Sequence, residues 1–162
     1  SSYEEPPSEE AKKMYYEAVR ALNQTYLSIK DLPAVIREHD KEKEALYCEF
    51  DFFKLLCRAY LRATKRSGNK VCIVLVDITD LQERPLSKRS LECCVANLKK
   101  LLCANLRSED AVSMCTPTQF VLLLQGAGKE NAELVIERIK KLFYKQYPHT
   151  PAKLSCYVDD LK

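Results

Sequence analysis

Apolar residues recur along this chain with two different periods, one typical of helices and one of strands. They repeat every three or four residues from Tyr47 to the Ser67–Gly68–Asn69 stop, over 88–106 and over about 130–146, which predicts three amphipathic helices. The β-branched run at 71–78 is continuous and predicts a strand covered on both faces. The helix positions predicted to face inward are Phe50, Phe53, Leu56, Cys57, Tyr60 and Thr64, then Leu91, Val95, Leu98, Leu102 and Leu106, and last Ala132, Val135, Ile139, Leu142 and Phe143.

Shorter apolar segments predict a hairpin and a final strand. Residues 111–115 and 119–124 are separated by Thr116–Pro117–Thr118, and a turn there would join two antiparallel strands. The segment 153–158 follows two prolines and predicts one more strand. The order from residue 46 is then helix, strand, helix, hairpin, helix, strand. Because this order does not alternate as in a doubly wound sheet, we predict an α+β fold.

The first 45 residues have a different character. Ser8, followed by two glutamates, predicts the start of a helix over 8–29. Its apolar seam suits packing on another helix, either of a second copy or of the same domain, and both readings stay open. The charged segment 31–45 predicts a linker or an exposed helix. We therefore divide the chain into an N-terminal helix and linker, 1–45, and a domain, 46–162. The seam consists of Ala11, Tyr15, Ala18, Leu22, Thr25 and Ile29.

Composition excludes several classes of protein. A content of 46% hydrophobic and 30% charged residues suits a folded domain rather than a disordered chain. The net charge of +3 is small and evenly spread, which argues against a nucleic-acid surface. No apolar stretch reaches the ~18 residues that a membrane span requires. The start lacks Met and a signal peptide, so we expect a cytoplasmic fragment of a longer protein.

Cysteine spacing argues against a metal site. The chain has 8 Cys and 2 His, and no two Cys have the C-x-x-C spacing of zinc ligands. Most of these Cys occupy apolar positions of predicted helices and strands, where a thiol acts as a small hydrophobe. We predict reduced cysteines in a cytosolic core and no metal or cofactor.

The residues that could carry chemistry lie around the predicted hairpin. Asp77 lies near the end of the buried strand, and Arg107 and Asp110 form an R-x-x-D motif. After a spacer of five residues the sequence TPTQF runs from Thr116 to Phe120. This frame resembles the GGDEF domain, the family that joins two GTP molecules into cyclic di-GMP. In that family a strand-end Asp helps to hold the metal, and an R-x-x-D precedes the G-G-[DE]-E-F signature by five residues.

The resemblance covers about residues 46–158 and implies a central mixed sheet flanked by helices, as in nucleotidyl cyclases. It also implies a site of two metal ions, carboxylates and glycines that let the nucleotide approach. Here Thr116 and Pro117 stand at the glycine positions, and the neutral Thr118 and Gln119 stand at the acidic ones. The family's guanine-reading Asn corresponds to Pro85. We therefore expect a vestigial site without diguanylate cyclase activity, formed by Asp77 and residues 116–120.

The R-x-x-D motif allows two interpretations. In active relatives this motif is the inhibitory site for cyclic di-GMP, where Arg binds a phosphate or a guanine edge and Asp accepts hydrogen bonds from guanine. By resemblance, Arg107 and Asp110 could therefore bind a cyclic dinucleotide. Alternatively, Arg107 is a solvated cation at a helix end and Asp110 caps the following turn.

A second resemblance concerns the N-terminus. Residues 4–19 are similar to the end of the bacterial transcriptional activation domain of antibiotic-regulatory-type activators, and 45–68 resemble the segment that joins such a module to a degenerate GGDEF-like domain. The letters that match the first pattern are Glu5, Pro7, Ser8, Glu10 and Tyr15. This implies a regulatory or dimerisation module of a transcriptional regulator, with DNA-binding and activation domains upstream. We expect no direct DNA contact by these residues, because no basic helix also carries base-reading side chains.

Overall fold

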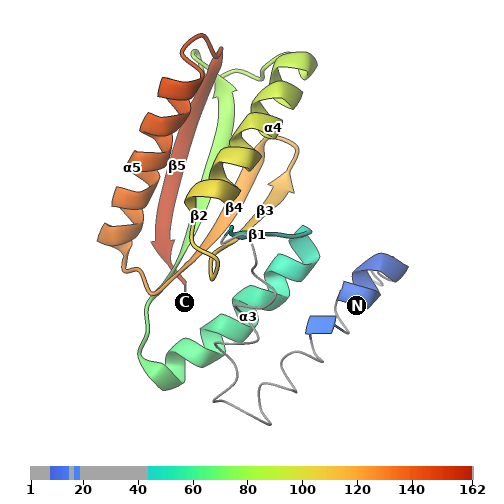
Figure 1. The fold of residues 1–162 in the computed structure, drawn as a ribbon, viewed down its shortest axis with the longest axis vertical. Helices are drawn as coiled ribbons and strands as arrows, with labels where there is room; N and C mark the ends of the chain where they lie inside the picture. Colours follow the sequence, from blue (N-terminus) through green and yellow to red (C-terminus); the bar gives the residue numbers. More distant parts are fainter. Residues whose placement is uncertain (1–7, 15–16, 19–43, 162) are drawn as a thin grey trace. The chain divides into compact units, whose positions relative to one another are not determined.

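The computed structural model describes residues 8–14, 17–18 and 44–161. The chain divides into two compact units, Ser1–Glu42 and Lys43–Lys162. The second unit contains, in order, β1 (Leu46–Tyr47), α3 (Phe50–Ser67), β2 (Val71–Asp80), α4 (Lys88–Asn105), β3 (Ala111–Thr116), β4 (Gln119–Gln125), α5 (Lys129–Gln146) and β5 (Ala152–Asp160) (Figure 1).

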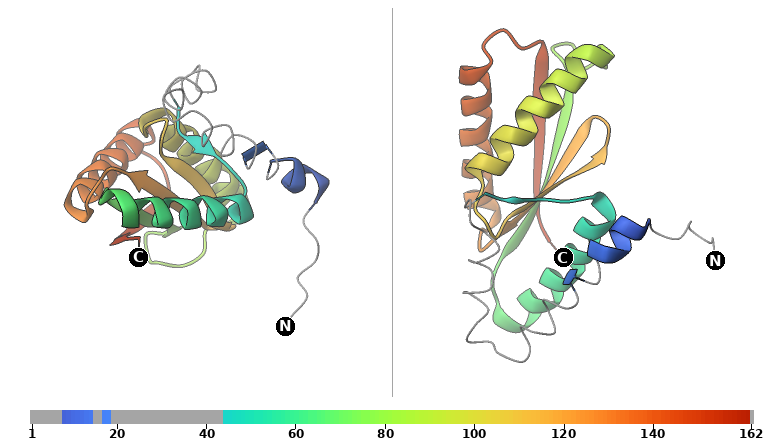
Figure 2. Two further views of the ribbon diagram at one scale, coloured as in Figure 1. Left: turned by 90° about the horizontal axis from the view of Figure 1, so that it is seen from below. Right: turned by 45° about the vertical axis from the view of Figure 1, so that its right-hand side comes forward.

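The five strands form one mixed sheet in the order β1-β3-β4-β2-β5. β1 runs parallel to β3, and the other neighbouring strands are antiparallel. Helices α4 and α5 cover one face, and α3 lies across the other (Figures 1 and 2). The predicted α+β architecture is therefore confirmed. No helix among the described residues is both long and apolar enough to cross a membrane.

The larger hydrophobic core lies between the sheet and helices α4 and α5. On β2 the residues facing it are fully buried, whereas Ile73, Leu75 and Asp77 on the α3 side are only half-buried. The prediction that this strand is covered on both faces is wrong, because α3 spans only part of the second face. Buried helix positions are Cys94, Leu98, Leu101 and Leu102 in α4 and Ala132, Ile136, Ile139 and Phe143 in α5.

The start of α3 differs from the prediction. The helix begins at Phe50 rather than near Tyr47, because the preceding residues form β1. There Leu46 N–H donates to the Asp110 carbonyl at 3.1 Å, and Cys48 N–H donates to the Val112 carbonyl at 3.0 Å. The helix ends at the predicted stop, where Gly68 has φ 73° and its N–H donates to the Thr64 carbonyl. Glycine takes this left-handed conformation without the steric cost of a Cβ.

Little of the predicted N-terminal organisation lies within the described residues. Residues 9–14 are helical, and Ser8 Oγ accepts a hydrogen bond from Ala11 N–H at 3.2 Å, as expected of an N-cap. Most of the 8–29 helix and the 31–43 part of the linker lie outside the described part. The domain boundary after residue 45 stays a prediction, although Ala45 is already buried and its N–H donates to the Cys103 carbonyl at 3.0 Å.

Candidate functional site at the β3–β4 hairpin

The turn between β3 and β4 consists of Pro117 and Thr118. Two-residue hairpins usually need positive φ angles, which proline cannot adopt. Within the described residues, the only non-glycine with positive φ is Glu83, so neither turn residue has this conformation. The strand register shifts between Met114 and Thr116. We infer that this bulge lets the two strands pair although neither central residue of the turn has a positive φ angle.

Polar groups at the hairpin tip bind one another. The Thr116 hydroxyl donates to Gln119 Oε1 at 3.2 Å and accepts from Thr118 N–H at 3.3 Å. The Thr118 carbonyl in turn accepts from Ile78 N–H of β2 at 3.0 Å. Phe120, directly after the tip, is fully buried in the larger core. The tip is thus closed by its own side chains and anchored to β2.

Asp77 lies beside the hairpin, as the sequence frame implied. It is paired with Gln119 of β4 on one side and Ser155 of β5 on the other. However, β2 continues to Asp80, so Asp77 is not the last residue of its strand. The carboxylate at the actual strand end, Asp80, accepts hydrogen bonds from Gln82 and Arg84 N–H, both at 2.8 Å, and thereby organises the exposed loop that contains Pro85.

Asp110 of the R-x-x-D motif is buried, with 3% of its surface exposed. Its Oδ1 accepts from Gln125 N–H at 3.1 Å and its Oδ2 accepts from Arg107 N–H at 3.0 Å. Burial raises the pKa of this carboxyl, although the two backbone N–H groups and the Arg107 guanidinium act in the opposite direction. Both carboxylate oxygens are therefore engaged within the domain.

Arg107 lies at the surface, with 57% of its side chain exposed. Its guanidinium donates to the Gln125 carbonyl and forms ion pairs with Glu109 at 3.3 Å and Asp110 at 3.8 Å. Gln125 Nε2 also donates to the Glu109 carbonyl at 2.8 Å. Gln125 thus connects the whole motif to β4, a role that the sequence analysis missed. The only local signal is its position before Gly126.

The candidate residues fall into two groups at opposite ends of β4. Asp77 and residues 116–120 surround its start, whereas Arg107 and Asp110 bind Gln125, its last residue. The seven residues of β4 place these ends roughly 20 Å apart, at about 3.3 Å per residue. The two groups are therefore separate sites.

Comparisons with known proteins place this architecture. No family model and no curated protein matches the sequence. Among solved structures, a diguanylate cyclase (DGC) protein from Thermotoga maritima is 23% identical, with a TM-score of 0.58 over 71% of this chain and 81% of that chain. The active GGEEF domain of a diguanylate cyclase from Vibrio cholerae is 15% identical, with a TM-score of 0.54 over 71% of this chain and 77% of that chain. The diguanylate cyclase SiaD from Pseudomonas aeruginosa, solved with its activator SiaC, is 13% identical, with a TM-score of 0.53 over 93% of this chain and 63% of that chain.

The chain has a GGDEF-like fold.

The metal pair expected in a GGDEF site does not fit the residues of this one. Asp77 is the carboxylate paired with the start of β4, whereas Thr118 and Gln119 of the hairpin are neutral. Asp80, at the end of β2, accepts hydrogen bonds from its own loop. Among the described residues, no three His, Cys, Asp or Glu side chains are grouped so that they could hold a metal ion. Two magnesium ions with a triphosphate need several anionic oxygen ligands, and residues 116–120 of this GGDEF-like domain supply none.

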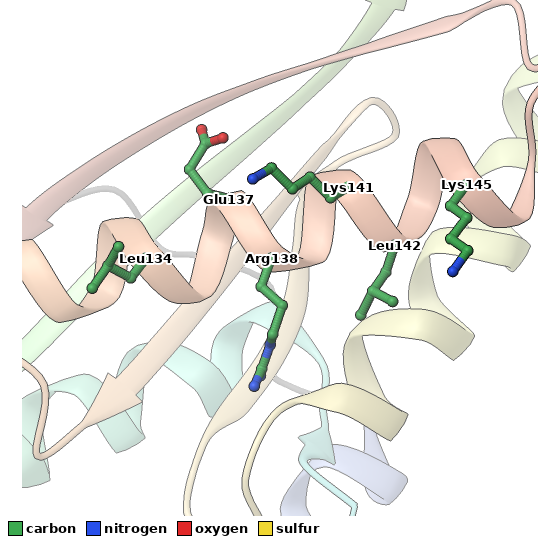
Figure 3. A pocket seen from close by; sticks show the side chains of 6 residues that line it. All are labelled: Leu134, Glu137, Arg138, Lys141, Leu142 and Lys145. Atoms are coloured by element: carbon green, nitrogen blue, oxygen red, sulfur yellow. The ribbon is translucent and has the colours of Figure 1, made fainter.

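Two surface hollows of the GGDEF-like domain lie away from both groups. One, of about 350 Å³, runs along α5 beside Leu134, Arg138 and Leu142 (Figure 3). Four of its six lining residues are of charged types, although their apolar stems form most of its surface, and Arg138 donates to the Asn105 carbonyl at 3.0 Å. The other, of about 390 Å³, lies between α4 and residues 146–151. Neither hollow is lined by Asp77, Arg107, Asp110 or residues 116–120.

Proposed function

We propose that this chain is a non-catalytic GGDEF-like module that serves regulation or dimerisation in a bacterial transcriptional regulator. The observation that carries this proposal is the hairpin tip, where neutral side chains bonded to one another replace glycines and carboxylates. The solved cyclases share the fold, but the fold does not itself supply catalysis.

The chemistry of GTP condensation supports the non-catalytic role. Magnesium ions must neutralise the charge on the triphosphate and activate the attacking hydroxyl. Residues 116–120 add no carboxylate beside Asp77, so the hairpin lacks the charge to hold two such ions. Pro117 and Thr116 also add side-chain atoms at the positions where glycines would let the protein backbone come close to the nucleotide. These side chains occupy space that glycine leaves free, and the neutral Thr118 and Gln119 at the acidic positions remove the charge.

The N-terminal resemblance supports a place in a transcriptional regulator. It suggests activation and DNA-binding domains upstream as partners in the same cytoplasmic protein. The seam of the 8–29 segment suits a homodimer, since apolar positions at heptad-like spacing favour helix pairing.

Turnover of GTP tests the proposal directly. We expect the purified chain, incubated with GTP and either Mg²⁺ or Mn²⁺, to form no cyclic di-GMP detectable by chromatography. A companion variant, Thr118→Glu with Gln119→Glu, adds two carboxylates beside Asp77, and we expect it to bind Mn²⁺ in calorimetry more tightly than the original chain. Product that disappears on Asp77→Asn would overturn the proposal.

A second candidate function is that of a cyclic di-GMP receptor through Arg107 and Asp110. The exposed guanidinium at Arg107 favours it, because a fork of N–H donors at the surface suits a phosphate. Against it, each Asp110 oxygen already accepts a backbone N–H, and guanine would have to compete for this carboxylate. Calorimetry with cyclic di-GMP separates the two functions. We expect no heat at high micromolar ligand, and heat that Arg107→Ala removes would support the receptor.

A further inference from the structure

The exposed side of α3 carries a row of cations. Five basic residues recur there at steps of three or four, and all are exposed; we call them the basic stripe: Lys54, Arg58, Arg62, Lys65 and Arg66. Because residues at this spacing share one side of a helix, the row is continuous. At 1.5 Å per residue it extends roughly 18 Å.

Most of this charge has no acidic partner among residues 44–161. Lys54 forms an ion pair with Asp51 at 3.1 Å. Within residues 44–161, Arg58, Arg62, Lys65 and Arg66 form no ion pair. The net charge of +3 conceals this local excess, because most acidic residues lie on other elements.

The helix holds the stripe in a fixed line. On the opposite side of α3, Phe53 is 1% exposed and packs in the smaller core with Leu123 and Val121 of β4. Leu56 and Tyr60 add to the same contact. The cations are therefore presented by a rigid element rather than by a loop.

We propose that the basic stripe binds the phosphate backbone of double-stranded DNA without reading its sequence. A duplex carries one negative charge about every 1.7 Å of its axis with both strands counted, so a length of about 18 Å carries about ten phosphates, and those on its near side can meet the row. Three of the four unneutralised side chains are arginines, whose planar fork of N–H donors matches phosphate oxygens. The stripe contains no Asn or Gln, the amides that read adenine, and no Asp or Glu to accept from cytosine.

An acidic protein is a poorer match for this surface. Protein interfaces depend on buried aromatic or aliphatic anchors and exclude charge from their centre. The one large apolar side chain exposed along the stripe is Leu55, at 38%. The sequence predicts no DNA contact because the charge looks evenly spread and because no basic helix carries base-reading side chains. The row on α3 concentrates the charge locally, and phosphate binding needs no base-reading helix. The proposal does not depend on whether the domain turns over GTP.

The test is fluorescence anisotropy of a labelled random-sequence duplex titrated with the whole chain. We expect the duplex to bind at low salt. The logarithm of the association constant should fall with the logarithm of the salt concentration at a slope of about −3 to −4, because each phosphate contact contributes about 0.9. The variant Arg58→Glu with Arg62→Glu should bind at least tenfold more weakly, and its salt dependence should be less steep by about two, because two phosphate contacts are lost. The variant Arg58→Gln with Arg62→Gln, which retains good helix formers, should also bind the duplex more weakly than the original chain.

The matched control is Lys88→Glu with Arg89→Glu, an equal change of charge at exposed positions of α4. Circular dichroism checks that every variant folds. The proposal is overturned if the chain does not bind the duplex at low salt, or if the control weakens binding as much as the stripe variant. It is also overturned if a polyglutamate peptide binds the stripe as tightly as the duplex does.

Discussion

Asp110 places a carboxylate in the interior, where an unpartnered charge would be costly. Two backbone N–H groups, from Arg107 and Gln125, compensate for the lost water. One donor belongs to the turn after α4 and the other to the end of β4, so the Asp110 side chain joins its own turn to a residue 15 positions further along the sequence. The same residue could thus be retained for folding even if no nucleotide binds.

We predict that Asp110→Asn destabilises the domain. The amide keeps the size of the side chain but offers an N–H group to one of the two backbone donors, so a buried hydrogen bond is lost at a cost of about 1–3 kcal/mol. Urea unfolding measures the change. Glu109→Gln is the matched control, because Glu109 makes an exposed ion pair and should alter the free energy of unfolding by less than about 0.5 kcal/mol. Equal effects of the two substitutions would contradict this assignment.

The pH dependence of this effect has a definite sign. Because burial raises the pKa of Asp110 above that of the unfolded chain, the folded state binds its proton more tightly. The contribution of this group to stability is therefore largest below about pH 4 and declines as pH rises through the folded pKa. Asn does not titrate, so the gap between the original chain and Asp110→Asn should be wider near pH 4 than near neutral pH.

Among the elements, β5 forms an edge of the sheet and would expose N–H groups along its outer side. Side chains bind three of them. Leu154 N–H donates to the Tyr144 hydroxyl at 2.9 Å, Ala152 N–H to Thr150 Oγ1 at 3.2 Å, and Asp160 N–H to Asp159 Oδ1 at 2.9 Å. These side chains reduce the capacity of the edge to pair with another strand.

We predict that Tyr144→Phe lowers stability by about 1–3 kcal/mol, because the Leu154 N–H loses its acceptor while Leu154 stays buried. Tyr157→Phe provides the comparison, since that ring is on the same edge strand and 62% exposed. Chemical denaturation of both variants measures the difference. If both variants lose the same free energy of unfolding, the hydrogen bond from Leu154 N–H to the Tyr144 hydroxyl does not stabilise the domain.

Most elements of the fold could be predicted because they are long enough for their hydrophobic pattern to repeat several times. Helices of 18 residues and the apolar β2 leave clear patterns. By contrast, β1 has 2 residues and leaves no period, so its pairing with β3 could not be found. In α5 the predicted face included Val135, which is half-buried, and missed Ile136, which is 4% exposed. Either position fits a three-or-four-residue step.

The candidate site shows the same division. The spacing of Asp77 and the hairpin was readable because the family frame is local in sequence. The bonds of Asp110 to Gln125 were not, because they depend on how the turn after α4 meets the end of β4. The alignment of Arg58 and Arg62 on one helix face was present in the sequence but was masked by the low net charge.

At the scale of the whole molecule, the chain enters the second unit through β1. Ala45 and Cys48 are buried, and the N–H groups of Ala45, Leu46 and Cys48 donate to α4, to the following turn and to β3. A fragment of residues 44–162 should therefore unfold cooperatively in urea, with a transition close to that of the same domain in the whole chain. A fragment of residues 49–162 should unfold at lower denaturant, because it lacks these bonds and exposes the edge of β3. Coincident transitions would show that β1 contributes nothing.

The parallel pairing of β1 also sets how the domain carries mechanical load. Tension applied from the N-terminal side at Glu44 meets the hydrogen bonds to Cys103, Asp110 and Val112 before it reaches α3. A force applied to the preceding residues therefore acts first on the turn that contains Arg107 and on β3, the strand that leads to the hairpin.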